Sequence, residues 1–127
     1  MLRLSAKTKL EPLEALDRAN KFFEEKGLTL AESIAHLHGK GGSAEIRVSG
    51  GRLVGKAEYD SKQVLSELSK SAADQFGFEP ASFSLHFHAI VGHVDVTVSN
   101  EKPAEVTLDS VEFDYQVSEF IDKLPRT

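Results

Sequence analysis

Two stretches of this chain, fifty residues apart, decide the fold that we expect: HLHGKGGSAEIRVSG at residues 36–50 and HFHAIVGHVDVTVSN at residues 86–100. When one is laid over the other, 5 of 15 positions are identical, where roughly one identity is expected by chance. Each stretch begins with a His-x-His pair and runs into alternating apolar and polar residues, which is the period of a β-strand. The match favours an internal duplication. The alternative is that two amphipathic hairpins look alike because both follow the same period-two pattern.

The segments outside these two stretches alternate between strand and helix patterns. Gly27 and Gly77 each follow an apolar stripe of helical spacing, so each is expected to end a helix. The apolar parity shifts between Leu108 and Val111, which predicts a bulge at Asp109-Ser110. The expected elements are strands over 2–8, 30–38, 44–49, 52–59, 82–90 and 93–99, a long strand or bent pair of strands over 104–116, and helices over 11–26, 61–76 and 117–124.

This element order predicts an α+β fold in which an antiparallel sheet carries two helices on one face. Residues 1–127 are expected to form one domain, made of two strand-helix-strand-strand halves at 2–50 and 52–100 and a C-terminal extension at 104–124. The order over residues 2–100 resembles that of GyrI-like and SOUL domains, which bind ligands or other proteins with two such halves. The resemblance carries no site residue over, because no motif matches. A helix-grip (START-like) arrangement is the alternative, although that fold places two helices after its first strand.

The two faces of the expected sheet differ in polarity. One face is apolar enough to pack helices and is expected to hold Leu37, Ile46, Val48, Phe83, Leu85, Phe87, Val94, Val96 and Val98. The opposite face is polar, with His36, His38, Glu45, Arg47, Ser82, Ser84, His86, His88, Asp95 and Thr97. Ile34 and Ile90 also fall on the polar face. Apolar side chains there favour a ligand cleft or a partner, although single exposed isoleucines are common.

The composition narrows the classes of function. The chain has 15 basic and 20 acidic residues, a net charge of −5, and its basic residues are scattered, so nucleic acid is not an expected partner. It has no cysteine, which excludes thiolate chemistry and cysteine-based metal sites. It also lacks the roughly 18 consecutive apolar residues that a membrane span needs. We therefore expect a soluble, cytoplasmic protein without a cofactor.

Four histidines form the most unusual pattern, as His36-x-His38 and His86-x-His88. Residues two apart in a strand share a face, so each pair directs two imidazoles the same way. Because imidazole binds Zn, Ni, Cu and Fe, convergence of the four would make a metal site. The alternative is that all four are solvated residues on the polar face of a sheet.

Motifs for catalysis are missing. The glycine-rich run at residues 39–43 is not followed by a helix, so it is interpreted as a hairpin turn and not as a phosphate loop. No GxSxG is present, and no carboxylate pair stands out. The leading hypothesis is a non-catalytic binding module for a small ligand or a protein partner, including a second copy of the chain. The alternatives are a metal-binding protein using the paired HxH motifs and an acid–base enzyme whose catalytic residues the sequence does not identify.

Overall fold

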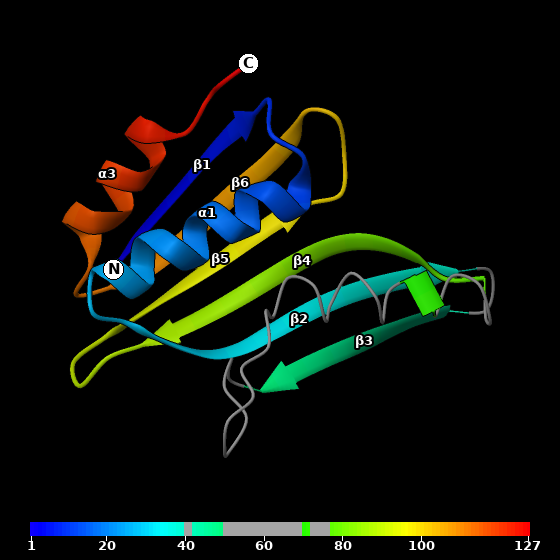
Figure 1. Ribbon diagram of the computed structural model, residues 1–127, viewed down its shortest axis with the longest axis horizontal. Coiled ribbons are helices and arrows are strands. Elements are labelled where there is room, and N and C mark those ends of the chain that lie inside the picture. The colour runs from blue at the N-terminus through cyan, green and yellow to red at the C-terminus, as the bar shows by residue number, and fades with distance from the viewer. Residues whose placement is uncertain (40–41, 50–69, 72–76) are drawn as a thin grey trace.

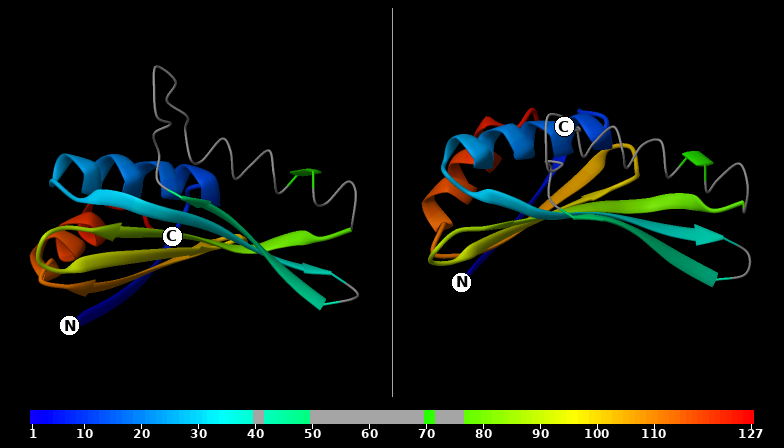
Figure 2. Two further views of the ribbon diagram at one scale, coloured as in Figure 1. Left: turned by 90° about the horizontal axis from the view of Figure 1, so that it is seen from below. Right: turned by 60° about the horizontal axis from the view of Figure 1, so that its bottom comes forward.

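The computed structural model describes residues 1–39, 42–49, 70–71 and 77–127, and within them six strands form one antiparallel sheet with the order β1-β6-β5-β4-β2-β3 (Figure 1). Helices α1 and α3 lie on the same face of this twisted sheet (Figure 2). The predicted α+β class and the antiparallel sheet are therefore confirmed. The elements are β1 (Leu2–Thr8), α1 (Pro12–Glu25), β2 (Thr29–Gly39), β3 (Gly42–Ser49), β4 (Glu79–His88), β5 (His93–Ser99), β6 (Ala104–Val111) and α3 (Asp114–Lys123).

Part of the predicted pattern falls on residues that the structure does not describe. The strand expected at 52–59 and nearly all of the helix expected at 61–76 lie outside the described residues. The tip of the glycine-rich hairpin, residues 40–41, lies outside them as well.

Helix α1 packs over strands β2, β4 and β5 near the centre of the sheet. Pro12 opens its first turn, where a missing N–H costs nothing, and Gly27 follows its last turn with φ +90°. Phe23 is fully buried, and its ring lies 5.4 Å from that of Phe87 on β4 and 5.6 Å from that of Phe120 on α3, between centroids. This aromatic cluster joins both helices to the sheet.

The inner face of the sheet has the apolar residues that the alternation predicted. Phe83, Leu85 and Phe87 of β4 are at most 3% exposed, and Val94, Val96 and Val98 of β5 are fully buried. All of them belong to one core cluster with the buried side chains of α1 and α3. The sequence alternation alone therefore predicts which side chains of the central strands face the core.

The prediction for residues 104–116 was wrong at its C-terminal end. β6 stops at Val111, and α3 begins at Asp114 instead of residue 117. No bulge interrupts the register at Asp109-Ser110. The apolar parity shifts there because Ser110 takes an inward position, 1% exposed, and its hydroxyl donates to Oδ1 of Asp114 at 2.7 Å. A serine whose hydroxyl has this acceptor can occupy a core position at little cost.

The pairing of the four strands β3-β2-β4-β5 repeats under a shift of fifty residues. In the two hairpins His36 faces Glu45 while His86 faces Asp95, and Glu32 faces Ser49 while Ser82 faces Ser99. Between β2 and β4, the pair His36–Ser82 is the shifted image of the pair Glu32–His86. The β2–β4 register is irregular between Leu30 and Glu32 and again between His36 and Leu37, and these two irregularities fall at equivalent positions of the fifty-residue repeat. Ile34 pairs with Ser84, its own equivalent fifty residues later, so this pair lies at the centre of the repeated pattern.

Two glycines with nearly the same backbone conformation give a matched test of this packing. Gly92 has φ +91° and Gly27 has φ +90°, but a Cβ on Gly92 would lie 2.2 Å from the carbonyl oxygen of Val111, whereas a Cβ on Gly27 would contact nothing within 4 Å. We predict that Gly27→Ala lowers the free energy of unfolding by only about 1–2 kcal/mol, because of left-handed backbone strain. Gly92→Ala lowers it by clearly more, because the backbone at Val111 must move as well. Urea unfolding of both variants measures the difference, and equal losses would contradict the close approach.

Candidate functional site

The outer face of the sheet carries mostly polar side chains on all six strands, and neither α1 nor α3 covers it (Figure 2). Cross-strand neighbours align its side chains in rows that run perpendicular to the strands. The first row contains Arg3, Asp109, Asp95, His86 and Glu32. The second contains Ser5, Thr107, Thr97, Ser84, Ile34 and Arg47.

Each hairpin carries one histidine–carboxylate pair on this face. Nδ1 of His86 lies 2.6 Å from Oδ1 of Asp95, and Nδ1 of His36 lies 3.4 Å from Oε1 of Glu45. The two pairs occupy equivalent places in the fifty-residue repeat. His93 adds a second imidazole near Asp95, with 3.7 Å between Nε2 and Oδ2.

The centre of this face is occupied by Ile34, which was predicted there as an exposed apolar residue. It is only 4% exposed. Its cross-strand neighbours are Ser84 and Arg47, and the Arg47 guanidinium is held by Glu32 and Glu45. The hydrogen bond from Arg47 to Glu45, and then the charges of Glu32 and Glu45, raise the pKa of Arg47 above its usual range. The aliphatic stem of Arg47 thus adjoins an isoleucine on the face that neither α1 nor α3 covers.

The four histidines of the HxH pairs are not brought to one point. His36 and His86 are on neighbouring strands, but His36 faces Ser82, four residues from His86 along β4, which corresponds to about 13 Å. His38 faces Glu79 and His88 faces Thr29, at opposite ends of the β2–β4 pair. In the described part of the chain, no group of three or more His, Asp or Glu side chains is placed to hold a metal ion. A metal site at these four residues stays a prediction.

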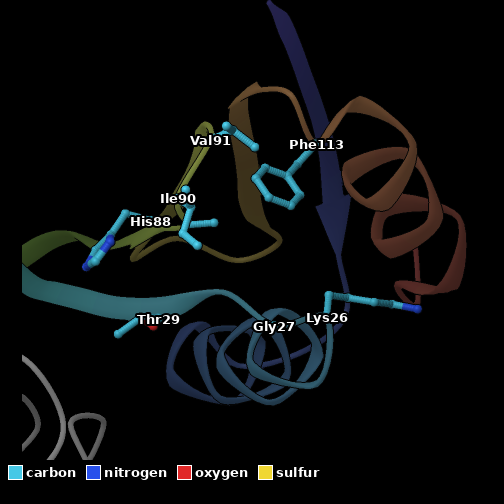
Figure 3. Close-up of a pocket in the computed structure, with 8 residues that line it drawn as sticks. Lys26, Gly27, Thr29, His88, Ile90, Val91 and Phe113 are labelled. Carbon is cyan, nitrogen blue, oxygen red and sulfur yellow. The ribbon is translucent and has the colours of Figure 1, made fainter.

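A hollow of about 480 Å³ lies at the end of the sheet where the β4–β5 hairpin turns (Figure 3). Its apolar walls are Ile90 and Val91 from the hairpin and Phe113 from the turn before α3. Ile90 is fully exposed and Val91 is 65% exposed. Lys26, Gly27, Thr29, His88 and Ala89 complete the lining.

The hairpin forms this wall because Gly92 lets it approach the end of β6. Val111 and Glu112 occupy the space where a Cβ of residue 92 would be. Glu112 has φ +72°, which is uncommon outside glycine, and redirects the chain from β6 into α3. The two backbone turns together bring the hairpin tip and Phe113 to the same hollow.

Lys26 contributes to the lining but directs its charge elsewhere. In Figure 3 its side chain extends away from the hollow toward α3, and its Nζ lies 3.2 Å from Oε1 of Glu119. The same ammonium lies 5.1 Å from the centre of the Phe22 ring. The hydrogen bond from Lys26 lowers the pKa of Glu119, with Lys123 adding to the effect.

Sequence reasoning missed most of this hollow. Phe113 was placed in a strand, and Thr29 and Lys26 had no signal of their own. Ile90 was singled out, but as a residue on the polar face of a strand over 82–90. β4 ends at His88, and Ile90 lies with Val91 in the turn, where Gly, Asn, Asp, Ser or Pro are usual. Two neighbouring apolar residues are therefore an unusual composition for this hairpin tip.

Comparisons with known proteins give no relative for this chain. No protein-family model matches it, and neither a curated protein sequence nor a solved structure matches it significantly. None of the helices found over residues 1–39, 42–49, 70–71 and 77–127 has the length and hydropathy of a membrane-spanning segment.

The ion pair beside the hollow has a testable signature. We predict that Lys26→Met raises the pKa of Glu119 toward that of an ordinary glutamate, and that Lys123→Met raises it less, because the hydrogen bond from Lys26 is the largest cause of the shift. Since the folded-state pKa is lowered, the pair stabilises the fold above the unfolded-state pKa, and this contribution is lost as the pH falls through the folded-state value. A carbon-detected NMR titration of the Glu119 carboxyl measures this pKa in the wild type and in the two variants. An unchanged value in Lys26→Met would mean that Glu119 does not hold this amine.

Proposed function

We propose that this protein is a non-catalytic binding module and that a small ligand with an apolar body occupies the hollow at the β4–β5 hairpin. The proposal is carried by one observation: Ile90 and Val91 are largely exposed, yet they share a hollow with Phe113. The volume of about 480 Å³ lies within the range of about 300–1,000 Å³ that is usual for ligand sites.

Exposed apolar side chains at one hollow favour a ligand on energetic grounds. Burying an isoleucine side chain contributes about 1.5–3 kcal/mol. Single exposed apolar residues are normal on protein surfaces. Here two exposed apolar residues, Ile90 and Val91, share a space with the half-buried Phe113 from a separate segment, so one ligand would contact all three.

An enzyme is the less supported alternative, although one arrangement has the order of a catalytic relay. Oε1 of Glu45 lies 3.4 Å from Nδ1 of His36, and Nε2 of that ring lies 3.3 Å from Oγ of Ser84. Ser84, however, is 5% exposed and sits in the middle of β4. β4 is paired on both sides, so its backbone N–H groups there belong to the sheet and are not free to stabilise an oxyanion.

Substitution of the hairpin tip tests the ligand hypothesis. We predict that wild-type protein binds the neutral probe 1-octanol with amide shift changes confined to residues 88–92, 26–29 and 113. In Ile90→Ser the dissociation constant rises by about tenfold or more, corresponding to about 1.4 kcal/mol of lost apolar contact. Stability should change little, because the side chain is fully exposed.

Tyr115→Ser is the matched control for this experiment. Tyr115 is also apolar and 77% exposed, but it does not line the hollow. Its replacement should leave octanol affinity unchanged. Equal losses in the two variants, or shifts scattered over the surface, would mean that the hollow is not a binding site.

Metal binding at the HxH pairs is a second candidate. It is favoured by the surroundings of the second pair: β5 places Asp95 opposite His86 and His93 opposite His88, so two further potential ligands adjoin it. The first pair has Glu45 opposite His36 but a serine opposite His38. Side-chain rotation would have to assemble such a site.

Titration with Zn²⁺ and Ni²⁺ tests the metal candidate. Micromolar or tighter binding with amide shifts at the HxH pairs is the expected result. We predict that His86→Ala abolishes it, while His36→Ala shows whether the first pair contributes. Tight binding that survives both substitutions, or no binding at all, would contradict a metal site at these histidines.

Two wider parts of the proposal rest on the sheet. The fifty-residue repetition of the strand register supports an internal duplication with halves at 2–50 and 52–100, as in the element order of GyrI-like and SOUL domains. The open polar face is the surface we assign to a protein partner or a second copy. Its carboxylates and the net charge of −5 argue against nucleic acid, and the lack of cysteine is compatible with a cytoplasmic location.

A further inference from the structure

We propose that the ligand of the hollow is an anionic amphiphile, a small molecule with an apolar chain or ring and one carboxylate, and that this carboxylate lies between His88 and Thr29. This inference rests on the proposed function and adds the chemical class of the ligand. It follows from the charges of the lining, from the hydrogen-bonding state of His88, and from the strand register at one end of the hollow.

The charges of the residues that line the hollow favour a negatively charged ligand. The ionisable residues among them are Lys26 and His88, and no aspartate or glutamate is among the lining residues. A ligand ammonium would therefore enter the hollow without a counter-charge, which is costly in a partly desolvated place. A carboxylate meets only neutral or positive groups there.

His88, and not Lys26, is the group that is available to such a carboxylate. The Lys26 amine is held by Glu119 and points away from the hollow. The imidazoles of His36, His86 and His93 each have a carboxylate neighbour, at distances of 3.4, 2.6 and 3.7 Å. The imidazole of His88 has neither a hydrogen bond nor an ion pair with any described residue, and the residue is exposed.

The register places a hydroxyl beside this imidazole. His88 is the direct cross-strand neighbour of Thr29 at the first pair of the β2–β4 ladder. The two lie away from Phe113, at the other side of the hollow (Figure 3). Cα atoms of directly paired residues in an antiparallel sheet are about 4.5–5.5 Å apart. An imidazole N–H and a threonine O–H can then donate to the two oxygens of one carboxylate while the apolar part extends toward Ile90, Val91 and Phe113.

The neighbouring charged groups leave this arrangement intact. On β5, His93 faces His88 directly, and Asp95 is engaged by His86 and His93. On the helix side the positive charge of Lys26 is matched by Glu119. Glu112 precedes Phe113 and is exposed, outside the lining.

Three probes with the same eight-carbon chain test the inference: sodium octanoate, 1-octanol and octylamine, each titrated at pH 7 below its aggregation concentration and followed by amide shifts. We expect octanoate to bind about fivefold or more tightly than octanol, and octylamine to bind most weakly. In His88→Leu the affinity for octanoate falls to that for octanol, because the donor is lost while the apolar walls remain.

His38→Leu is the matched control, since residue 38 is the exposed equivalent of residue 88 in the fifty-residue repeat and lies at the far end of the β2–β4 pair. It should leave all three affinities unchanged. Equal binding of octanoate and octanol to the wild type, or a preference for octylamine, would overturn the carboxylate inference and leave the proposed function standing. No binding of any probe would overturn both.

Discussion

The aromatic contact between α1 and the sheet is the interaction on which the rest of the structure depends. Phe23 is completely buried and lies against Phe87 of β4 and Phe120 of α3, so one side chain connects the central sheet to both helices. Because side chains alternate along a strand, burying Phe87 on the helix side turns His86 and His88 to the opposite face. The packing of the core thus determines which residues remain for binding.

The candidate site is a consequence of a second constraint, the contact between the β4–β5 hairpin and the end of β6. Only a residue without a Cβ fits at position 92, because the carbonyl of Val111 occupies that space. This approach places two exposed apolar side chains next to Phe113 and creates the hollow. Ile90 and Val91 lie outside the hydrophobic core cluster of the described residues, so their apolar surface stays in contact with water.

The repeated strand register explains both the similarity and the difference between the two hairpins. Positions fifty residues apart carry His36 with Glu45 and His86 with Asp95, so each hairpin places a histidine beside a carboxylate. At the centre of the β2–β4 pairing, Ile34 faces Ser84, the residue fifty positions further on. The two hairpins also differ at their ends: Gly39 is approached by the Phe78 ring, whereas at the corresponding end of β4 the chain continues into Ala89 and the open hollow.

The sequence by itself determined the α+β class, the strands of the central sheet, the polarity of its two faces and the start of α1, because these depend on local periodicity and on glycine and proline. It did not determine the end of β6, where Glu112, with φ +72°, turns the chain into α3. Only the tertiary structure decided that the four HxH histidines lie at separate points, because strand register depends on pairing across the sheet. The hollow was likewise set by tertiary structure, as residues 26–29, 88–91 and 113 meet only when α1, the β4–β5 hairpin and the turn before α3 pack together.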